Sequence, residues 1–280
     1  KFEEILGIVN GTTNYILTQM TEYGLDYADV LKVAQEKGFA EADPTADVEG
    51  IDVANKLSIL ISLVFGIRVT TNEIPTEGIT KISKDDIALA DKFGYKIKLL
   101  ATAKKVGDQL EAHVQPAFVP KDHPLAAVSN EFNAIFVTGN AVDDLMFYGK
   151  GAGPLPTGSA VMGDVIEISR AIAKNAAFDH HTESKAVKML RYVGEGQNKY
   201  YVNMMVKDVP GVLGGISTTF GAFGIGVDSV LQLSKDVNTN REVPLIFILH
   251  EVTRARLDEA LDKISSSKFA SEIKSIIRVM

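Results

Sequence analysis

Apolar residues in the N-terminal part of the chain recur at helical spacing, and glycines separate the segments. The pattern predicts helices over residues 12–24, 26–37 and 83–93, each ending at a glycine or just before one. The first helix is expected to have its N-cap at one of three residues: Thr12, Thr13 or Asn14. Ser83 is expected to cap the helix at 83–93.

Another predicted helix begins at Pro44, a residue that suits a first helical turn, with Asp47 near its positive end. From Ile51 to Phe65 this segment is apolar on nearly every side. A helix of that kind is normally buried in the centre of a domain. We therefore expect this helix to be surrounded by other elements.

After residue 94 the helical spacing gives way to alternation of apolar and polar residues, which indicates strands. Two hairpins are predicted, 95–106 with 109–119 and 132–138 with 141–148. Their turns contain Gly107-Asp108 and Gly139-Asn140, which are typical hairpin residues. A glycine- and proline-rich loop, 149–157, then opens a helix predicted from about 159 to 176.

The pattern resets after residue 196 and predicts a β-α-β-β-α-β unit of ferredoxin-like type. The strands are expected at 200–206, 226–233, 243–250 and 273–279, and the helices at 212–223 and 253–266. A polar stretch at 179–182 precedes the reset, so we expect two domains, 1–194 and 195–280. The predicted fold class is α+β: helices with a mostly antiparallel sheet, then the ferredoxin-like unit.

The 280 residues are 46% hydrophobic, enough for a core, and carry a formal net charge of −7. A general nucleic-acid binder would need a basic face, so that class is not expected. No cysteine is present, which rules out disulfides within the chain and fits a cytoplasmic location. No apolar run is long enough for a membrane span. Because the chain begins at Lys1, we expect it to be a fragment of a longer protein.

The stretch Gly38–Lys56 is the strongest candidate site, because it joins an acid-rich turn to an apolar helix. Asp52 and Lys56 lie four residues apart and share one helix face. One interpretation is a pocket in which carboxylates bind an ammonium group and the lysine moves a proton. The other is a surface salt bridge worth only about 0.3–0.5 kcal/mol, which the spacing alone favours.

Other polar features are open to two interpretations. The loop Gly149–Thr157 can bring backbone N–H groups to a phosphate or a nicotinamide, or it is only a tight connection. His180-His181 suggests a metal, but adjacent histidines converge poorly on one ion and a solvated linker is favoured. A carboxylate metal site at Glu41, Asp43 and Asp47 has weak support, and no metal is expected.

Three motifs stand out along the chain. They are Asn10-Gly11-Thr12-Thr13-Asn14-Tyr15-Ile16, then Gly38-Phe39-Ala40-Glu41-Ala42-Asp43-Pro44 with Asp47, Asp52 and Lys56, then Gly151-Ala152-Gly153 with Pro156-Thr157. Together they resemble homoserine dehydrogenase over about residues 1–180. They occur in the order of the family. The segment Lys207–Leu213 after a strand looks like the start of an ACT regulatory domain.

The resemblance implies interconversion of L-homoserine and L-aspartate 4-semialdehyde with NAD or NADP, in the biosynthesis of threonine, methionine and isoleucine. The implied roles are catalysis for Lys56, substrate binding for Glu41, Asp47, Asp52 and Thr12, and cofactor contacts for Gly38, Gly153, Gly11 and Ala152. L-threonine is the implied effector, near Asp208, Gly211 and Leu213. Phe39 departs from the family, which often has tyrosine there, so a hydroxyl contact is lost.

The family's strand–GxGxxG–helix unit is absent from this sequence. The resemblance therefore implies the substrate-binding and regulatory part of the enzyme, inactive alone, in a homodimer or homotetramer. An alternative is an amino-acid-sensing and oligomerisation module without catalysis, since an exposed sheet edge in the tail could pair with another. A metal-dependent carbon–oxygen lyase is disfavoured, because a lysine shares the helix face with the acids.

Overall fold

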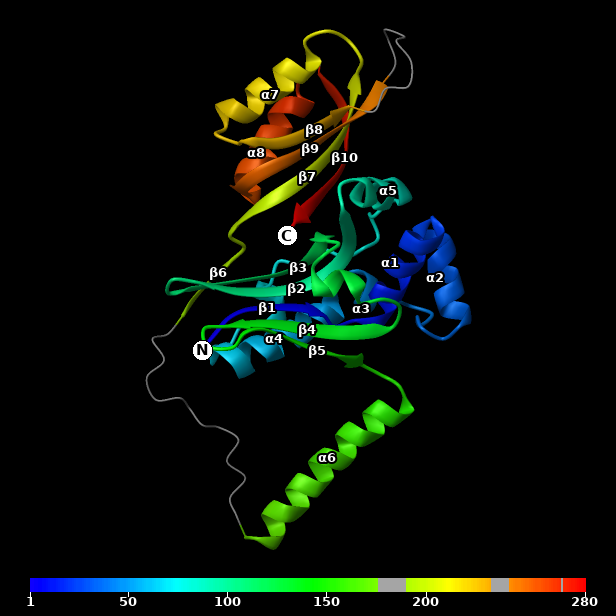
Figure 1. Cartoon of the computed structure of the whole chain (residues 1–280), viewed down its shortest axis with the longest axis vertical. Coiled ribbons are helices and arrows are strands. Elements are labelled where there is room, and N and C mark those ends of the chain that lie inside the picture. The colour runs from blue at the N-terminus through cyan, green and yellow to red at the C-terminus, as the bar shows by residue number, and fades with distance from the viewer. Residues whose placement is uncertain (176–189, 233–241, 268) are drawn as a thin grey trace.

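One mostly antiparallel sheet continues from the N-terminal part of the chain into the C-terminal part (Figure 1). The computed structural model describes residues 1–175, 190–232, 242–267 and 269–280. The N-terminal part of the sheet has the order β5-β4-β1-β2-β3. Its strands are β1 (Phe2–Ile8), β2 (Tyr95–Val106), β3 (Gln109–Pro120), β4 (Phe132–Gly139) and β5 (Asp143–Lys150). Both predicted hairpins are confirmed, whereas β1, the central strand, was not predicted.

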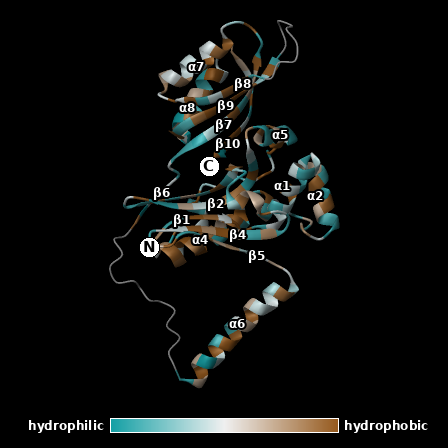
Figure 2. Ribbon diagram, in the orientation of Figure 1, coloured by the Kyte–Doolittle hydropathy of each residue, from teal (hydrophilic) through white to brown (hydrophobic). Residues whose placement is uncertain are grey.

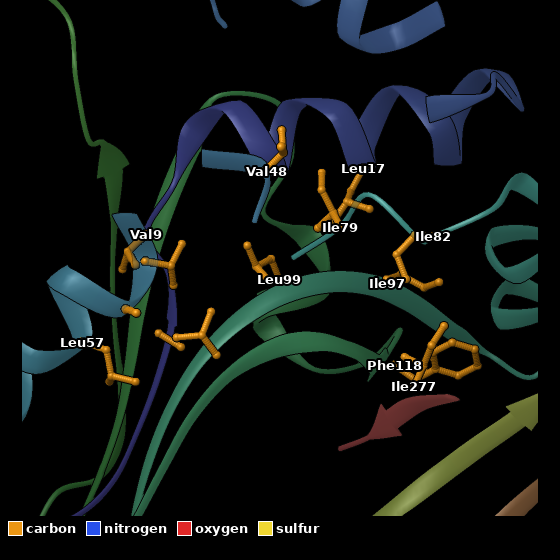
Figure 3. Close-up of a cluster of buried hydrophobic side chains, with 14 of the residues drawn as sticks. Val9, Leu17, Val48, Leu57, Ile79, Ile82, Ile97, Leu99, Phe118 and Ile277 are labelled. Carbon is orange, nitrogen blue, oxygen red and sulfur yellow. The ribbon is translucent and has the colours of Figure 1, made fainter. Parts of the chain in front are cut away.

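The helices before β2 are α1 (Gly11–Tyr23), α2 (Tyr27–Glu36), α3 (Thr45–Val48), α4 (Ile51–Phe65) and α5 (Lys84–Lys92), with a short 3-10 turn η1 (Thr71–Glu73). Side chains from α1, α3 and α4 meet the strands in a hydrophobic core, which Figure 3 shows around Leu17, Val48, Leu57 and Leu99. Full burial of one such leucine stabilises the fold by about 1.5–3 kcal/mol. A smaller core lies under the 3-10 turn η2 (Pro124–Ala127).

The helix predicted from Pro44 is two helices, α3 and α4, and the continuous prediction is wrong. Gly50 separates them with a φ of +81°, a conformation that other residues adopt only with strain. The backbone at Gly78 packs against the break, where an added Cβ would lie 2.1 Å from the Val48 carbonyl oxygen. The kink therefore has a tertiary cause, and it places Asp47 and Asp52 on different helices.

Helix α4 is also not buried on all sides, contrary to the prediction. Its residues Val53, Leu57 and Ile61 face the core, whereas Ile59 and Leu63 are 59% and 76% exposed. The helix lies on the outside of the sheet, so only one stripe of it finds partners in this chain. Figure 2 shows the hydrophobic residues of α4 in brown.

Helix α6 (Pro154–Ala173) projects away from the sheet (Figure 1) and buries none of its residues. Within the described ranges, no helix is long and apolar enough to cross a membrane.

The C-terminal unit has the predicted β-α-β-β-α-β order. It consists of β7 (Gln197–Lys207), α7 (Val212–Ala222), β8 (Val227–Gln232), β9 (Glu242–Thr253), α8 (Arg254–Ser265) and β10 (Ala270–Val279), preceded by the short strand β6 (Arg191–Gly194). The strands lie in the order β10-β7-β9-β8, and both helices pack on a core of their own. The tip predicted at 235–241 and the polar stretch at 179–182 lie outside the described residues.

The sheet does not stop at the predicted domain boundary, because β10 pairs with β3 in parallel. Arg278 and Val279 lie opposite Ala117 and Phe118, and the Met280 N–H donates to the Phe118 carbonyl. β10 thus has β3 on one side and β7 on the other, and its backbone ladders join the two units. The short strand β6 also pairs with β3 in parallel.

A buried group of polar side chains, here called the junction cluster, lies where the units meet. Its members are His113, Gln115, Glu195, Tyr200 and Arg278. The Arg278 Nε donates to Gln115 Oε1 at 2.5 Å, and its guanidinium pairs with Glu195. The His113 Nε2 faces Arg278 Nη1 at 2.5 Å and must accept, since guanidinium only donates. Burial, and then the charge of Arg278, lower the pKa of His113 well below its usual value, so the imidazole is neutral.

A second polar contact between the units involves Asp86, at the start of α5. One of its carboxylate oxygens caps the helix with Ser83, as predicted for that serine. The other accepts from Ser275 of β10 at 2.5 Å and from the Tyr201 hydroxyl of β7 at 3.3 Å. The carboxylate therefore ties α5 to both strands of the C-terminal unit that lie nearest the junction.

Candidate active site

Lys56 lies on α4, one turn after the start of the helix. Its Nζ donates to Asp52 Oδ2 at 2.7 Å and to the backbone carbonyl of Val9 at 2.9 Å. The side chains of the pair are 46% and 30% exposed. The predicted helix spacing of Asp52 and Lys56 is thus confirmed, and the pair is open to solvent on one side. The contact with Val9, at the end of β1, ties the lysine to the centre of the sheet.

Asp47 and Asp52 come from different helices and meet at one residue, Asn10. The Asn10 Nδ2 donates to Asp47 Oδ1 at 2.7 Å and to Asp52 Oδ2 at 2.9 Å. Asn10 is also the N-cap of α1, so the expectation of a cap at Thr12, Thr13 or Asn14 is wrong. Asn10 was not among the predicted site residues, although an asparagine before a helix is a recognisable cap signal.

The turn before α3 carries Glu41. Its carboxylate makes no hydrogen bond or ion pair with any residue that the structure describes, and its side chain is exposed. Two contacts fix the turn itself: Thr12 Oγ1 donates to the Phe39 carbonyl at 2.7 Å, and Gln35 Nε2 donates to the Glu41 carbonyl at 3.1 Å. Gly38 begins the turn with a φ of +76° and has open space at the Cβ position. The turn that carries Gly38 and Glu41 is therefore held by α1 through Thr12 and by α2 through Gln35.

Gly11 has a structural explanation besides the cofactor contact predicted for it. A Cβ at this position would lie 2.9 Å from the Glu131 carbonyl oxygen, so the glycine allows α1 to pack on the loop before β4. Asn14 holds the same loop, because its amide donates to the carbonyls of Val128, Asn130 and Phe132. Buried Lys98 also donates to Asn14 and Val128, and burial lowers the pKa of its amine to about 8.

The glycine loop after β5 lies beside this arrangement. The Lys150 Nζ is 3.0 Å from a carboxylate oxygen of Glu131, the residue on which Gly11 packs. Ala152 and Gly153 follow, both exposed, and Gly153 precedes α6 with a φ of +116°. The first and third sequence motifs are thus connected through residues 128–132, whereas the second is joined to the first through Asn10 and Thr12.

The residues at this edge fit an anionic cofactor group. Gly38 and Gly153 expose backbone that carries no side chain, and α6 begins without an acidic residue in its first turn. Free N–H groups at a helix N-terminus favour a phosphate, but Pro154 and Pro156 have none. Among the first three residues of α6 only Leu155 carries an N–H, so the fit depends mainly on the exposed glycine backbone. No group of three or more His, Asp or Glu side chains suitable for a metal is found among the described residues. His180-His181 lies outside them.

A separate hollow of about 360 Å³ lies in the C-terminal unit. It is lined by residues 206–213 together with Gln232 and Leu245, so it includes the predicted Asp208, Gly211 and Leu213. Gln232 Nε2 donates to Asp208 Oδ1 at 2.8 Å, and Gly211 starts α7 with a φ of +92°.

The model of the family described as homoserine dehydrogenase matches residues 1–166. The chain belongs to the homoserine dehydrogenase family. It is 40% identical to the homoserine dehydrogenase of Synechocystis over 295 aligned positions, which cover all of this chain and 66% of that protein. The crystal structure of a homoserine dehydrogenase from Thiobacillus denitrificans has a TM-score of 0.89 and 33% identity, covering all of this chain and 64% of the other.

A hyperthermophilic archaeal homoserine dehydrogenase mutant in complex with NADPH is similar over 59% of this chain and 47% of the other, with a TM-score of 0.50 and 29% identity. The chain therefore spans less than two thirds of the length of the homoserine dehydrogenases with which it was compared. The predicted family is confirmed.

Proposed function

We propose that this chain supplies the substrate-binding and catalytic residues of an NAD(P)-dependent homoserine dehydrogenase, which interconverts L-aspartate 4-semialdehyde and L-homoserine. The observation that carries the proposal is the Lys56 ammonium, held between Asp52 and the Val9 carbonyl beside Asp47 in a member of this family. Family membership supports the use of NAD or NADP, and one relative was crystallised with NADPH. The glycine-motif residues would contact the cofactor through their backbones; they are Gly38, Gly11, Ala152 and Gly153.

The arrangement suits proton transfer at a substrate oxygen. A lysine ammonium has three N–H donors, and two of them are used by Val9 and Asp52. The third can bind the aldehyde oxygen and supply the proton that makes it a hydroxyl. In the reverse direction the amine accepts the hydroxyl proton. NAD(P), when bound, would supply or remove the hydride.

The carboxylates suit the amino group of the substrate. Asp47 and Asp52 share the Asn10 amide, and Asp52 also pairs with Lys56, so the two carboxylates lie together beside the lysine's partner. The exposed Glu41, on the turn before α3, would complete the set. Holding the substrate ammonium at this point would fix the distance of its reacting carbon from the lysine, which matters because small misplacements slow a reaction strongly. Thr12 ties this turn to α1 and would act from the edge of the site.

The test is NADPH oxidation dependent on L-aspartate 4-semialdehyde, measured in the full-length protein. Activity that disappears without the semialdehyde supports the proposal, and no activity with either NADH or NADPH contradicts it. Calorimetric titration with L-homoserine measures substrate binding separately from turnover. The pathway, the biosynthesis of threonine, methionine and isoleucine, and a cytoplasmic location stay predictions.

The C-terminal unit, residues 195–280, supports a second role as an ACT regulatory domain. Its β-α-β-β-α-β order and the hollow at Asp208, Gly211 and Leu213 favour binding of a small amino acid, for which we propose L-threonine. Titration of the whole protein with L-threonine should give heat that Asp208→Ala abolishes. Asp228→Ala, an exposed aspartate on β8, is the control. Binding without any effect on turnover would favour the sensing module over the regulated enzyme.

Exposed apolar side chains support a homodimer or homotetramer. Ile59 and Leu63 on α4 and Phe147 on β5 are each more than half exposed. Large contiguous patches of exposed apolar side chains are unusual on monomers and often mark interfaces. The outer edge of β8, the last strand of the sheet, is a further candidate surface. Sedimentation velocity at several concentrations measures the oligomeric state.

A further inference from the structure

Asn10 uses the full hydrogen-bonding capacity of its side chain. Its Oδ1 accepts from the backbone N–H of Thr13 at 2.9 Å and from the Thr13 hydroxyl at 3.0 Å. Its Nδ2 donates to Asp47 and Asp52, as described above. A primary amide has two donor hydrogens and two acceptor lone pairs, so none is left over. The residue is 6% exposed, and water does not compete for these contacts.

The contacts also fix which way the amide points. A backbone N–H can only donate, so the atom that receives the Thr13 N–H is the oxygen of Asn10. The NH2 group must then face the two carboxylates. Rotation of the amide by half a turn would place its oxygen against Asp47 and Asp52 and would lose every one of these hydrogen bonds.

Helix capping does not explain the choice of asparagine at this position. Serine, aspartate and asparagine cap helices about equally well, and Ser83 does so at α5. Among these residues only asparagine caps with an oxygen and presents N–H donors at the same time. The two acceptors belong to α3 and α4, which lie 37 and 42 residues further along the chain. The donors therefore serve the site rather than helix α1.

The Asn10 amide holds two carboxylates close together and leaves one oxygen of each available to a ligand. Asp47 and Asp52 each give one oxygen to Asn10, and Lys56 shares the same oxygen of Asp52. Their other oxygens, Asp47 Oδ2 and Asp52 Oδ1, have no donor among the residues that the structure describes. Two carboxylates and one ammonium leave one negative charge in excess, which a ligand ammonium would balance.

We propose that Asn10 is the positioning residue for the ammonium group of the substrate: its amide sets Asp47 and Asp52 at one spacing, with their second oxygens facing the ligand. This rests on the proposed function. Val9, the residue before it, holds Lys56 through its carbonyl. The dipeptide Val9-Asn10, directly after β1, thus fixes the positions of both the ammonium-binding acids and the lysine that moves the proton.

The test is calorimetric binding of L-homoserine to the full-length protein and to two variants that keep the helix cap. Asn10→Ser removes the paired N–H donors and should weaken binding about tenfold or more at every pH, because a charged hydrogen-bond pair is lost. Asn10→Asp places a third carboxylate beside Asp47 and Asp52. The neighbouring negative charges should raise the pKa of the introduced carboxyl group. We expect weak binding at high pH and recovery as the pH falls, since the introduced carboxyl group can donate a hydrogen bond once it is protonated.

The control is Ser83→Ala, which removes a helix cap at α5 and should lower stability without changing L-homoserine affinity. If Asn10 served only as a cap, both Asn10 variants would bind like the wild type at all pH values, and that result would overturn the inference. If the wild type itself binds no L-homoserine, the proposed function fails instead.

A measurement on the unaltered protein avoids any folding defect of the variants. With asparagine labelled by nitrogen-15, the two side-chain amide signals of Asn10 should shift when L-homoserine is added. They should not shift with N-acetyl-L-homoserine, which keeps the carboxylate and the side-chain hydroxyl but lacks the ammonium group that Asp47 and Asp52 would bind. Signals that stay unchanged at saturating L-homoserine would contradict a role for this amide.

Discussion

The candidate site and the junction cluster both pair carboxylates with a cation, but water reaches only the first. The side chains of Lys56 and Asp52 are 46% and 30% exposed, whereas those of Arg278 and Glu195 are 4% and 14% exposed. A pair in water is weak and can exchange a partner for a ligand. A buried pair cannot, because a charge left alone in the interior is costly. Exposure thus separates a pair available for chemistry from one that holds two units together.

If Lys56 is available for chemistry, removing it should affect turnover and little else. For Lys56→Ala in the full-length protein we expect kcat to fall about 10²–10⁴-fold, the usual contribution of a proton-transferring group. KM for L-homoserine and the melting temperature should change little, since the side chain is half exposed. Lys84→Ala breaks the exposed pair with Asp26 and is the matched control. An unchanged kcat in Lys56→Ala would remove the lysine from the mechanism.

The opposite result is expected at the junction. Arg278→Met leaves Glu195 buried without its partner and should lower the free energy of unfolding by about 3–5 kcal/mol. Turnover per folded molecule should stay near that of the wild type. Lys121→Met breaks an exposed pair with Asp91 and should cost less than about 1 kcal/mol. Urea unfolding followed by circular dichroism compares the two, and equal losses would show that burial does not distinguish them.

The junction should also be sensitive to acid. Burial and Arg278 lower the pKa of His113 in the folded protein, so between the unfolded value of about 6.5 and the folded value only the unfolded chain takes up the proton. Stability is therefore complete above about pH 6.5 and falls as the pH drops, by up to about 1.4 kcal/mol per unit. Unfolding curves from pH 8 to pH 5 measure this loss. Between pH 8 and pH 5 the His113→Gln variant should lose less of its free energy of unfolding than the wild type. If stability fell equally with pH in both proteins, His113 would not be a neutral buried histidine.

The smallest effect is expected at Glu41, whose carboxylate has no partner among the described residues. Glu41→Ala should raise KM for L-homoserine by about tenfold, because the substrate would lose one charged hydrogen bond. The kcat and the stability should change little. Glu36→Ala, an exposed acid at the end of α2, should leave KM unaltered. Steady-state kinetics decides, and a fall in kcat at constant KM would assign Glu41 a different role.

Local signals predicted most of the elements from the sequence. The hairpin of β2 and β3 and the cap at Ser83 depend on neighbouring residues only, and both are confirmed. The break at Gly50 was missed, because a glycine within an apolar helical pattern does not reveal the packing of Gly78 against it. β1 was missed because its buried half, Ile5–Ile8, reads as a short apolar run without alternation, as expected of a strand covered on both faces.

The site was predicted from family motifs, and the structure adds how its members are connected. No periodicity links Asn10 to acids in α3 and α4, since these contacts arise only when β1 ends beside both helices. The same holds for His113 and Arg278, which are 165 residues apart. Polar contacts between segments far apart in the sequence leave no local pattern, so local sequence patterns cannot predict them.

The position of β10 has a consequence for the order in which the molecule assembles. Both of its neighbours, β3 and β7, are synthesised before it, together with β8 and β9. Until residues 270–279 leave the ribosome, the edges of β3 and β7 that pair with β10 have no partner strand. His113 and Glu195 likewise lack their partner Arg278. Strand β10 therefore closes both units at once, and the growing chain exposes open strand edges to its neighbours until that moment.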